Sequence, residues 1–260
     1  MDVTYDKIGH GYNLTRKGEP KIANDVMSLL NPIEDELFLD IGCGTGNYTV
    51  FFEKSGLNCI GIDPSDVMIE AAKLRSDRVD WRLGSAEHTG LPKESVDGVV
   101  AILTVHHWND LTTSFSELSS VLKRRGRIVI FTALPTQLDN YWLKHYFPGM
   151  IAQSKAKLPS LDEIGKAAEV NKMRVTNTKN YYIHQQQSDL FLYSGKHDPS
   201  VYLDEQVRAG ISSFATAADD KEITTGLYRL ESDIRSGEID SVTQLFNGKS
   251  GDYKYVVITK

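Results

Sequence analysis

The chain has 260 residues, of which 40% are hydrophobic and 25% are charged, values typical of a globular protein with one large domain or a core domain that carries an insertion. Its 29 Lys and Arg residues face 35 Asp and Glu residues, and the net charge of −6 makes nucleic acid a poor partner because phosphate backbones would be repelled. The two cysteines, Cys43 and Cys59, are too few for a disulfide framework and have no zinc-binding spacing, so we expect no metal site.

The amino-terminal segment, Met1 to Asp6, is polar and acidic and lacks the apolar core of a secretory signal. No apolar run is long enough to cross a membrane as a helix. We therefore expect a cytoplasmic protein without a membrane span, present as a monomer or a homodimer. Residues 1–30 are expected to form a helical cover ahead of the first strand.

Five short apolar runs alternate with helical patterns in the first half of the chain, and each run has the length of a strand. The runs are residues 37–41, 58–63, 79–83, 98–105 and 127–131. Where these runs are continuously apolar, we expect strands that are buried on both faces of a parallel sheet. Helical spacing predicts crossover helices between them, for example over residues 66–74 and 113–122. This alternation indicates a doubly wound α/β fold.

The pattern changes after residue 133, where prolines and large aromatic side chains interrupt the alternation. A capping box at Ser160 and Glu163 predicts the start of a helix, and residues 175–183 and 253–258 are predicted as two further strands. We expect a Rossmann-like, mostly parallel seven-stranded sheet with helices on both faces and a helical lid insertion. The expected core comprises residues 31–134, 160–184 and 250–260, and the expected lid comprises residues 135–159 and 185–249.

A glycine-rich loop, Asp40-Ile41-Gly42-Cys43-Gly44-Thr45-Gly46, follows the first predicted strand and precedes a helical stretch. Glycines at alternate positions let the backbone turn sharply and approach a ligand closely. The dinucleotide fingerprint would require a small residue at position 47, which is Asn47 here. The next strand ends at Asp63, about 20 residues further on, where a carboxylate can accept hydrogen bonds from both hydroxyls of a ribose. The two features together indicate a cofactor with an adenosine-like ribose.

Residues 37–131 resemble the core of class I S-adenosylmethionine (SAM)-dependent methyltransferases, of the small-molecule type related to the ubiquinone and menaquinone biosynthesis methyltransferases. The matching segments, in the family's order, are Leu39–Gly46, Gly61–Ser65 with Met68, Gly84–Glu87 with Leu91–Pro92, Val96–Val100 with His106–Trp108, and Arg125–Arg127. The resemblance covers the first half of the chain and is specific for SAM binding, but it does not identify the acceptor. It implies SAM as the cofactor and S-adenosylhomocysteine (SAH) as its product.

The resemblance also assigns roles to individual residues of the glycine loop and the second strand. It implies that the backbone of Gly42 and Gly44 passes beside the methionine part of SAM and that Asp63 holds the ribose hydroxyls. The same motifs supply further candidates for cofactor binding, which are Asp40, Cys43, Pro64 and Ala101.

For the adenine, the resemblance implies that Met68 packs on the ring and that Ser85, Ala86 and Glu87 lie at its edge. Many relatives have Asp at the position of Ser85, so a hydroxyl or a backbone oxygen would accept a hydrogen bond from the adenine amino group in this chain. Near the amino terminus, Tyr12 and Arg16 resemble residues of a helix that covers the cofactor. Arg16 would pair with the SAM carboxylate and Tyr12 would face the sulfonium, unless both residues only pack or face solvent.

Methyl transfer from a sulfonium is an in-line displacement with a neutral leaving group, so orientation of the reactants supplies most of the catalysis, up to ~10 kcal/mol. A base is needed only where the acceptor must lose a proton. His106 and His107 follow the fourth predicted strand, at the edge of the sheet where open α/β folds bind ligands, and are the candidate catalytic residues. Either ring has the alternative of packing against the loop.

The acceptor site is expected in the lid, where a set of aromatic residues would either line an apolar pocket or pack into the lid's own core. These residues are Tyr141, Trp142, Tyr146, Phe191, Tyr193 and Phe214. The expected function is methyl transfer to a small molecule, at an oxygen, nitrogen or carbon atom that the sequence does not identify. The alternatives are a nucleotide-dependent oxidoreductase, which the glycine spacing disfavours, and a non-catalytic SAM-binding protein. An RNA or protein acceptor lacks a basic groove in the sequence, and arsenite methylation would need more than two thiols.

Overall fold

The computed structural model describes residues 15–216, 219–246, 248 and 250–260. The predicted contact of Tyr12 with the cofactor and the first 14 residues of the predicted cover therefore lie outside the described residues. No helix among the described residues is long and apolar enough to cross a membrane.

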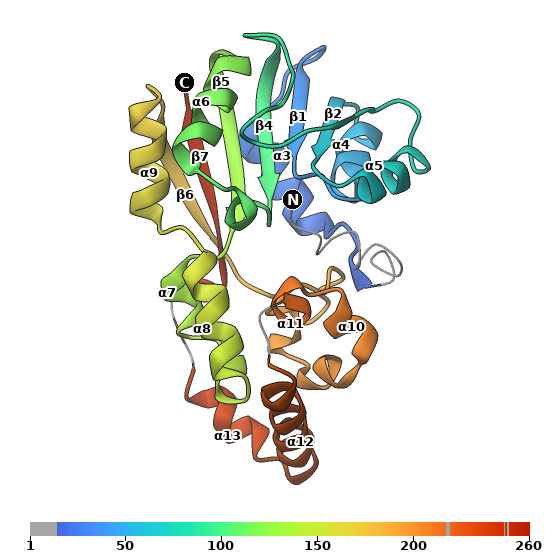
Figure 1. Ribbon diagram of the computed structural model, residues 1–260, viewed down its shortest axis with the longest axis vertical. Coiled ribbons are helices and arrows are strands. Elements are labelled where there is room, and N and C mark those ends of the chain that lie inside the picture. Colours follow the sequence, from blue (N-terminus) through green and yellow to red (C-terminus); the bar gives the residue numbers. More distant parts are fainter. Residues whose placement is uncertain (1–14, 217–218, 247, 249) are drawn as a thin grey trace.

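Seven strands form a single sheet in the order β3-β2-β1-β4-β5-β7-β6, as Figure 1 shows. The strands are β1 (Leu37–Ile41), β2 (Asn58–Asp63), β3 (Asp80–Leu83), β4 (Val96–Ile102), β5 (Leu122–Thr132), β6 (Arg174–Tyr181) and β7 (Tyr253–Thr259). Strands β1 to β5 pair in parallel, whereas β7 runs antiparallel to both β5 and β6. The predicted seven-stranded, mostly parallel sheet is confirmed.

Helices cover both faces of the sheet and enclose two hydrophobic clusters. On one face, α3 (Pro20–Leu30) and α4 (Thr49–Lys54) pack on alternate residues of the strands, such as Phe38 and Val100. On the other face, α6 (Leu111–Val121) and α9 (Leu161–Val170) pack on the intervening residues, such as Leu39 and Val99. A third crossover helix, α5 (Asp66–Lys73), contacts β2 and β3. The predicted doubly wound arrangement is therefore present.

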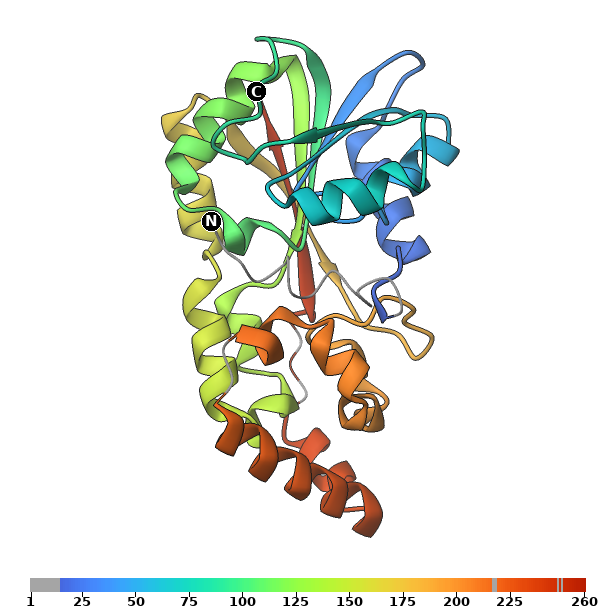
Figure 2. The same cartoon turned by 45° about the vertical axis from the view of Figure 1, so that its right-hand side comes forward.

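The remaining helices form a region of their own beyond one end of the sheet, which Figures 1 and 2 show below the strands. We call this the helical region. Its elements are α7 (Pro135–Leu138), η2 (Trp142–His145), α8 (Pro148–Lys157), η3 (Ser194–Lys196), η4 (Pro199–Leu203), α10 (Glu205–Ala209), α11 (Ser212–Thr216), α12 (Asp220–Ser236) and α13 (Ile239–Gln244).

Aromatic packing joins the helical region to the sheet. Tyr141 stacks on Tyr193 with ring centroids 3.6 Å apart, and Tyr253 of β7 lies 6.1 Å from Tyr141. All six aromatic residues that the sequence offers for an acceptor pocket are buried in the cluster that also covers one face of the sheet. Of the two alternatives for these residues, packing into a core is the one that the structure shows.

Two local features show how the sequence sets element boundaries. The predicted capping box is confirmed, because Glu163 N donates to Ser160 Oγ at 3.2 Å and Ser160 N donates to Glu163 Oε2 at 2.8 Å. The strand predicted over residues 98–105 is displaced, because β4 spans Val96–Ile102. Leu103 has a φ of 54°, which lies in the left-handed region and ends the extended conformation.

Candidate functional site

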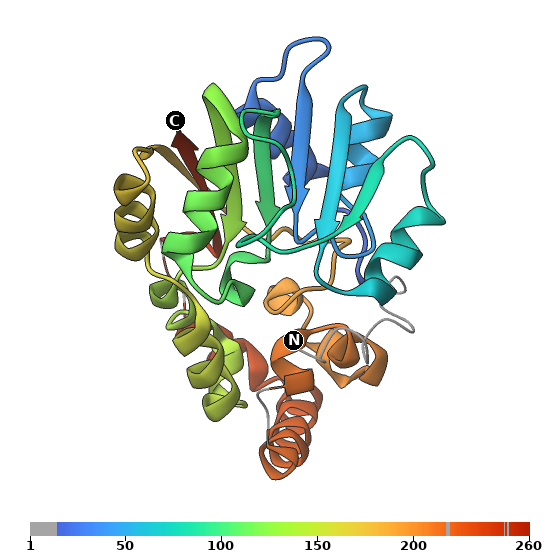
Figure 3. The ribbon, with the colours of Figure 1, turned by 45° about the horizontal axis from the view of Figure 1, so that its top comes forward.

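The site lies where the strand order of the sheet reverses, between β1 and β4. The crossover after β1 leads to β2 on one side, and the crossover after β4 leads to β5 on the other side. In open α/β sheets the carboxyl ends of strands at such a point form the ligand-binding crevice. Figure 3 shows that these ends of β1, β2 and β4 point toward the helical region. The glycine loop, Asp63 and the two histidines all follow or end these three strands.

The three glycines of the loop all have positive φ angles, but their surroundings differ. A Cβ at Gly42 would lie 2.0 Å from Thr104 Oγ1, and a Cβ at Gly46 would lie 2.4 Å from the Trp81 ring. These two positions need glycine because neighbouring side chains press on the backbone. Gly44 has a φ of 55°, yet a Cβ there would meet none of the described residues within 4 Å. The loop is therefore packed at both ends and borders open space at its centre.

Asp63 holds the loop from the neighbouring strand. Its Oδ2 accepts a hydrogen bond from Gly44 N at 2.8 Å, and its Oδ1 accepts one from Ser65 N at 3.0 Å. The residue is 8% exposed. The backbone of Gly42 and Cys43 donates to the Ile62 carbonyl at 2.7 and 3.1 Å. These bonds place the Asp63 carboxylate beside the open centre of the loop, where the resemblance implies that it meets a ribose.

A second carboxylate, Asp40, lies buried at the base of the loop. Its Oδ2 accepts a hydrogen bond from Thr49 Oγ1 at 2.6 Å. Burial, and to a lesser extent the charge of Asp63, raises the pKa of Asp40 from 3.8 to about 7. Burial also raises the pKa of the Cys43 thiol, so this cysteine stays protonated and is no nucleophile at neutral pH.

The residues predicted around the adenine differ in burial and in their hydrogen bonds. Met68 is buried on α5, and Ala86 is buried in the loop after β3. Glu87 accepts hydrogen bonds from Asn109 N at 2.7 Å and Ser114 Oγ at 3.3 Å, so its carboxylate joins this loop to the segment after β4. Ser85 forms a side-chain hydrogen bond with Glu87.

Two further cofactor candidates differ in accessibility. Pro64 is exposed directly after β2, next to Asp63. Ala101 is fully buried within β4, where it pairs with Ile130 of β5 and belongs to a hydrophobic cluster. The structure thus leaves Pro64 accessible beside Asp63 and places the side chain of Ala101 in the core.

His106 and His107 lie in η1 (Val105–His107), three residues past the end of β4, with ring centroids 4.1 Å apart. The Nδ1 atom of His106 is buried and has no hydrogen-bond partner among the residues that the structure describes. Burial, together with smaller effects of nearby positive groups, lowers the pKa of His106 well below its ordinary value. The ring is therefore neutral at pH 7 and can accept a proton or a hydrogen bond.

The structure brings Arg16 to a partner that sequence reasoning missed. Arg16 Nε donates to Asp189 Oδ1 at 2.6 Å, and Tyr48 Oη donates to Asp189 Oδ2 at 2.9 Å. Asp189 is 1% exposed and lies on the segment that connects β6 to the helical region. No sequence pattern relates residues so far apart along the chain, so only the fold could identify this contact.

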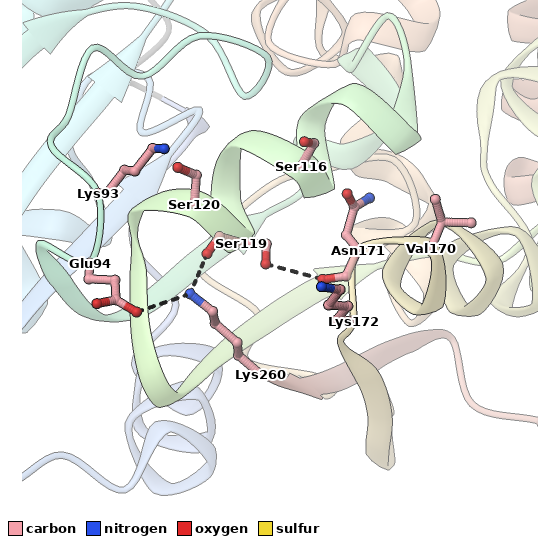
Figure 4. A pocket seen from close by; sticks show the side chains of 9 residues that line it. All are labelled: Lys93, Glu94, Ser116, Ser119, Ser120, Val170, Asn171, Lys172 and Lys260. Carbon is pink, nitrogen blue, oxygen red and sulfur yellow. Dashed lines mark hydrogen bonds and ion pairs between the residues drawn. The ribbon is translucent and has the colours of Figure 1, made fainter.

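A surface depression of about 470 Å³ lies at the opposite end of the sheet (Figure 4). Lys260 Nζ occupies its floor and donates to the carbonyl oxygens of Ser119 and Leu122, each at 2.7 Å. The first carbonyl belongs to the last turn of α6 and the second to the residue that follows the helix, so the ammonium caps a helix end. Among the described residues, no three His, Cys, Asp or Glu side chains form a group that could hold a metal ion.

The residues at these strand ends suit SAM in their chemistry. The open space at Gly44 lets a ligand approach the backbone closely, and the carboxylates of Asp63 and Asp40 suit a ligand with ribose hydroxyls and positive groups. The protonated Asp40 would regain its charge beside a cation, because an opposite charge lowers the pKa of a carboxyl group.

Comparison with known proteins agrees with this site. A family model described as a methyltransferase domain matches residues 39–130, which include the glycine loop, Asp63 and the histidines. The chain is 32% identical over 130 residues to a protein of Dictyostelium discoideum named as a methyltransferase, a match that covers 49% of each chain. It is 36% identical over 98 residues to a ubiquinone biosynthesis O-methyltransferase of Rhodopseudomonas palustris, which covers 36% of this chain and 38% of the relative. The matches thus span about half, or less, of these curated relatives.

Solved structures extend the similarity to the whole chain. A methyltransferase assigned to an antibiotic biosynthesis pathway of Anabaena variabilis has 35% sequence identity and a TM-score of 0.84, and the alignment covers 95% of this chain and 99% of that one. Geranyl diphosphate C-methyltransferase of Streptomyces coelicolor shares the fold, with a TM-score of 0.57 and 17% identity over 92% of this chain and 75% of its own.

Proposed function

The chain belongs to the class I SAM-dependent methyltransferases, and we propose that it transfers the methyl group of SAM to a small-molecule acceptor. The observation that carries the proposal is the open centre of the glycine loop at Gly44, held by the Asp63 carboxylate beside the end of β4. The segment that carries the histidines adjoins the first end of the glycine loop, because Thr104 packs against Gly42. Cofactor and acceptor would therefore meet at one crevice.

The residues that would hold SAM are those of the three neighbouring strand ends. The backbone around Gly44 would lie along the methionine part, the Asp63 carboxylate would accept hydrogen bonds from the ribose hydroxyls, and Asp40 would supply negative charge at the base of the loop. SAM supplies a methyl group on a positively charged sulfur that leaves as a neutral thioether. The chain's own contribution is to orient the acceptor in line with that methyl group and to exclude water.

His106 is the residue that we propose to contact the methyl acceptor. Its buried Nδ1 atom has no partner among the described residues and its ring is neutral at pH 7, so it can accept a hydrogen bond from a hydroxyl or an amine of the acceptor. For an acceptor that must lose a proton, the same nitrogen would take it as a general base. His107 shares the turn and would orient its neighbour.

The small-molecule class is supported by the named relatives and by the charge of the chain. A ubiquinone biosynthesis O-methyltransferase and a geranyl diphosphate C-methyltransferase are both similar to it, and each acts on a small molecule according to its name. The net charge of −6 disfavours a nucleic-acid acceptor. The buried aromatic residues do not indicate whether the methyl group is transferred to an oxygen, a nitrogen or a carbon atom.

The test is an assay of SAH release from SAM with panels of phenols, carboxylic acids and amines, with mass spectrometry of the products. We expect one panel to yield a product that is heavier by one methylene group, with an equal amount of SAH. The His106→Gln variant serves as the matched control, because it should bind SAM and release less SAH. A protein that binds SAM and methylates nothing in these panels would favour a non-catalytic SAM-binding role.

A further inference from the structure

Asp189 is a buried carboxylate at which three segments of the chain meet. It accepts hydrogen bonds from Arg16 Nε at 2.6 Å, from Arg16 Nη2 at 3.4 Å and from Tyr48 Oη at 2.9 Å. Arg16 precedes α3, and Tyr48 directly follows the sequence of the glycine loop and Asn47. Asp189 itself lies between β6 and the helical region. One side chain therefore ties the cofactor loop to both of the other segments.

Other hydrogen bonds surround this carboxylate and join the same segments. Leu190 N donates to the Thr15 carbonyl at 3.0 Å, and the Ser188 amide and hydroxyl donate to Glu19 Oε2 at 2.8 and 2.7 Å. Asn47 Nδ2 donates to the Arg16 carbonyl at 3.1 Å. We call residues 15–19, 47–48 and 188–190 the clasp.

The ion pair between Arg16 and Asp189 fixes the direction of the guanidinium, which the surrounding hydrogen bonds do not do. Burying two charges is costly, and neutral groups of similar size would join the segments as well. A carboxylate that contacts two nitrogens of one guanidinium, however, fixes the direction of that group. The positive charge of Arg16 is also felt at His106, where it adds to the effect of burial in lowering the pKa of that ring. Through the shared Asp189 carboxylate, the fixed guanidinium lies near Tyr48, two residues past the glycine loop.

We propose that Asp189 is a positioning residue that fixes the Arg16 guanidinium at the cofactor site and couples cofactor binding to the segment leading into the helical region. The inference rests on the proposed function, since the cofactor is taken to be SAM. Coupling is reciprocal, so an ordered clasp strengthens cofactor binding and bound cofactor orders the clasp. Cofactor binding would thereby order residues 188–190, which lead into the helical region.

Hydrogen exchange at two backbone amides reports on the clasp directly. The amides of Ser188 and Leu190 both donate across it, so their exchange rates measure how often it opens. In the wild type, SAH should slow the exchange of both amides by about tenfold. In Asp189→Asn, which keeps the size of the side chain but removes its charge, SAH should bind about tenfold more weakly and should no longer slow these amides.

The matched control is Asp252→Asn, which breaks another partly buried ion pair, with Lys196 Nζ at 2.9 Å, at the edge of the helical region. It should leave both the SAH dissociation constant and the response of the two amides at their wild-type values. An equal loss of SAH affinity in the two variants would mean that any broken ion pair loosens the protein, and it would overturn the positioning role of Asp189.

Tyr48→Phe serves as a second variant because it removes one donor and leaves the ion pair in place. It should weaken SAH binding in the same direction but less than Asp189→Asn, and it carries the test if Asp189→Asn does not fold. A wild-type SAH affinity in folded Asp189→Asn, or in Tyr48→Phe used in its place, would overturn this inference alone. A folded wild type that binds no SAH would instead overturn the proposed function and this inference with it.

Discussion

The backbone N–H of Gly44 donates a hydrogen bond to Asp63 Oδ2 at 2.8 Å, which links the turn after β1 to the end of β2. The two residues belong to separate sequence motifs, and each is indicative of a cofactor site only in the presence of the other. Their contact holds the loop in a left-handed turn at Gly44 while one side of its backbone faces open space. Substitutions at this contact and around it therefore distinguish cofactor binding from folding.

Replacing Gly44 by alanine should impair cofactor binding more than folding. In the described part of the chain, a Cβ at this position meets no atom within 4 Å, but it enters the space in which we place SAM. The left-handed backbone costs an alanine about 1–2 kcal/mol. Gly237→Ala is the matched control, since Gly237 has a φ of 82°, open surroundings and a remote place after α12. Calorimetry should show weaker SAH binding for Gly44→Ala only, and equal binding by both variants would place SAM elsewhere.

Replacing Asp40 by asparagine should change how stability depends on pH. Because the pKa of Asp40 is about 7 in the folded chain and 3.8 ordinarily, the folded protein holds a proton between these pH values that the unfolded chain has released. The free energy of unfolding therefore falls as the pH rises from about 4 to about 7, by up to about 4 kcal/mol from this group. The asparagine side chain would keep an acceptor for Thr49 Oγ1 and remove this dependence.

Urea unfolding at several pH values measures the Asp40 effect as a difference between variant and wild type. Asp40→Asn should be increasingly more stable than the wild type as the pH rises to 8, while near pH 4 the two should be alike. A constant difference across this range would show that Asp40 is ionised in the folded protein.

The two histidines should differ in their effect on turnover. His106→Gln should lower kcat by about a hundredfold or more if the ring acts as a base, and it should leave SAH affinity near its wild-type value. His107→Gln should act more weakly. Because the pKa of His106 is well below its ordinary value of 6.5, the wild-type rate should not fall as the pH is lowered through 6.5. Steady-state kinetics between pH 5 and 8 checks both points, and a rate that halves near pH 6.5 would exclude His106 as that base.

Removing the Glu87 carboxylate should disturb the loop after β4. Glu87→Ala removes the acceptor of the exposed Asn109 amide, which water can replace, so the loss of stability should be small, about 1 kcal/mol or less. Glu117→Ala is the matched control, because Glu117 accepts from the Thr89 amide at 2.9 Å and has no contact with that loop among the hydrogen bonds described. Glu117→Ala should lose more stability than Glu87→Ala in thermal unfolding, because Thr89 is buried and donates to Glu117 through both its amide and its hydroxyl. Only Glu87→Ala should slow methyl transfer. Equal turnover in the two would leave Glu87 with a role in stability alone.

Local patterns predicted the strands and the glycine loop well, because burial and turn geometry depend on residues that are close together in the sequence. Short apolar runs identified β1, β2, β4 and β5, and alternate glycines identified a loop in which Thr104 and Trp81 press on Gly42 and Gly46. The end of β4 was displaced because no residue type at Leu103 signals a left-handed φ.

Long-range contacts could not be predicted in the same way. Arg16 and Asp189 are 173 positions apart, and neither has a sequence pattern that points to the other. The aromatic residues of the helical region illustrate a second limit, since spacing cannot distinguish side chains that line a pocket from side chains that pack on one another, as Tyr141 and Tyr193 do. Both outcomes depend on how distant segments meet, which only the folded chain determines.

The most direct test of the account is calorimetric titration of the wild type and of Asp63→Asn with SAH, with NADH as a comparison ligand. Asp66→Asn, a change at an acidic residue in the first turn of α5, is the matched control. We predict micromolar SAH binding by the wild type and by Asp66→Asn, binding weakened by about tenfold or more in Asp63→Asn, and no binding of NADH. Folded wild-type protein that gives no heat with SAH, or Asp63→Asn that binds SAH as the wild type does, would contradict the account.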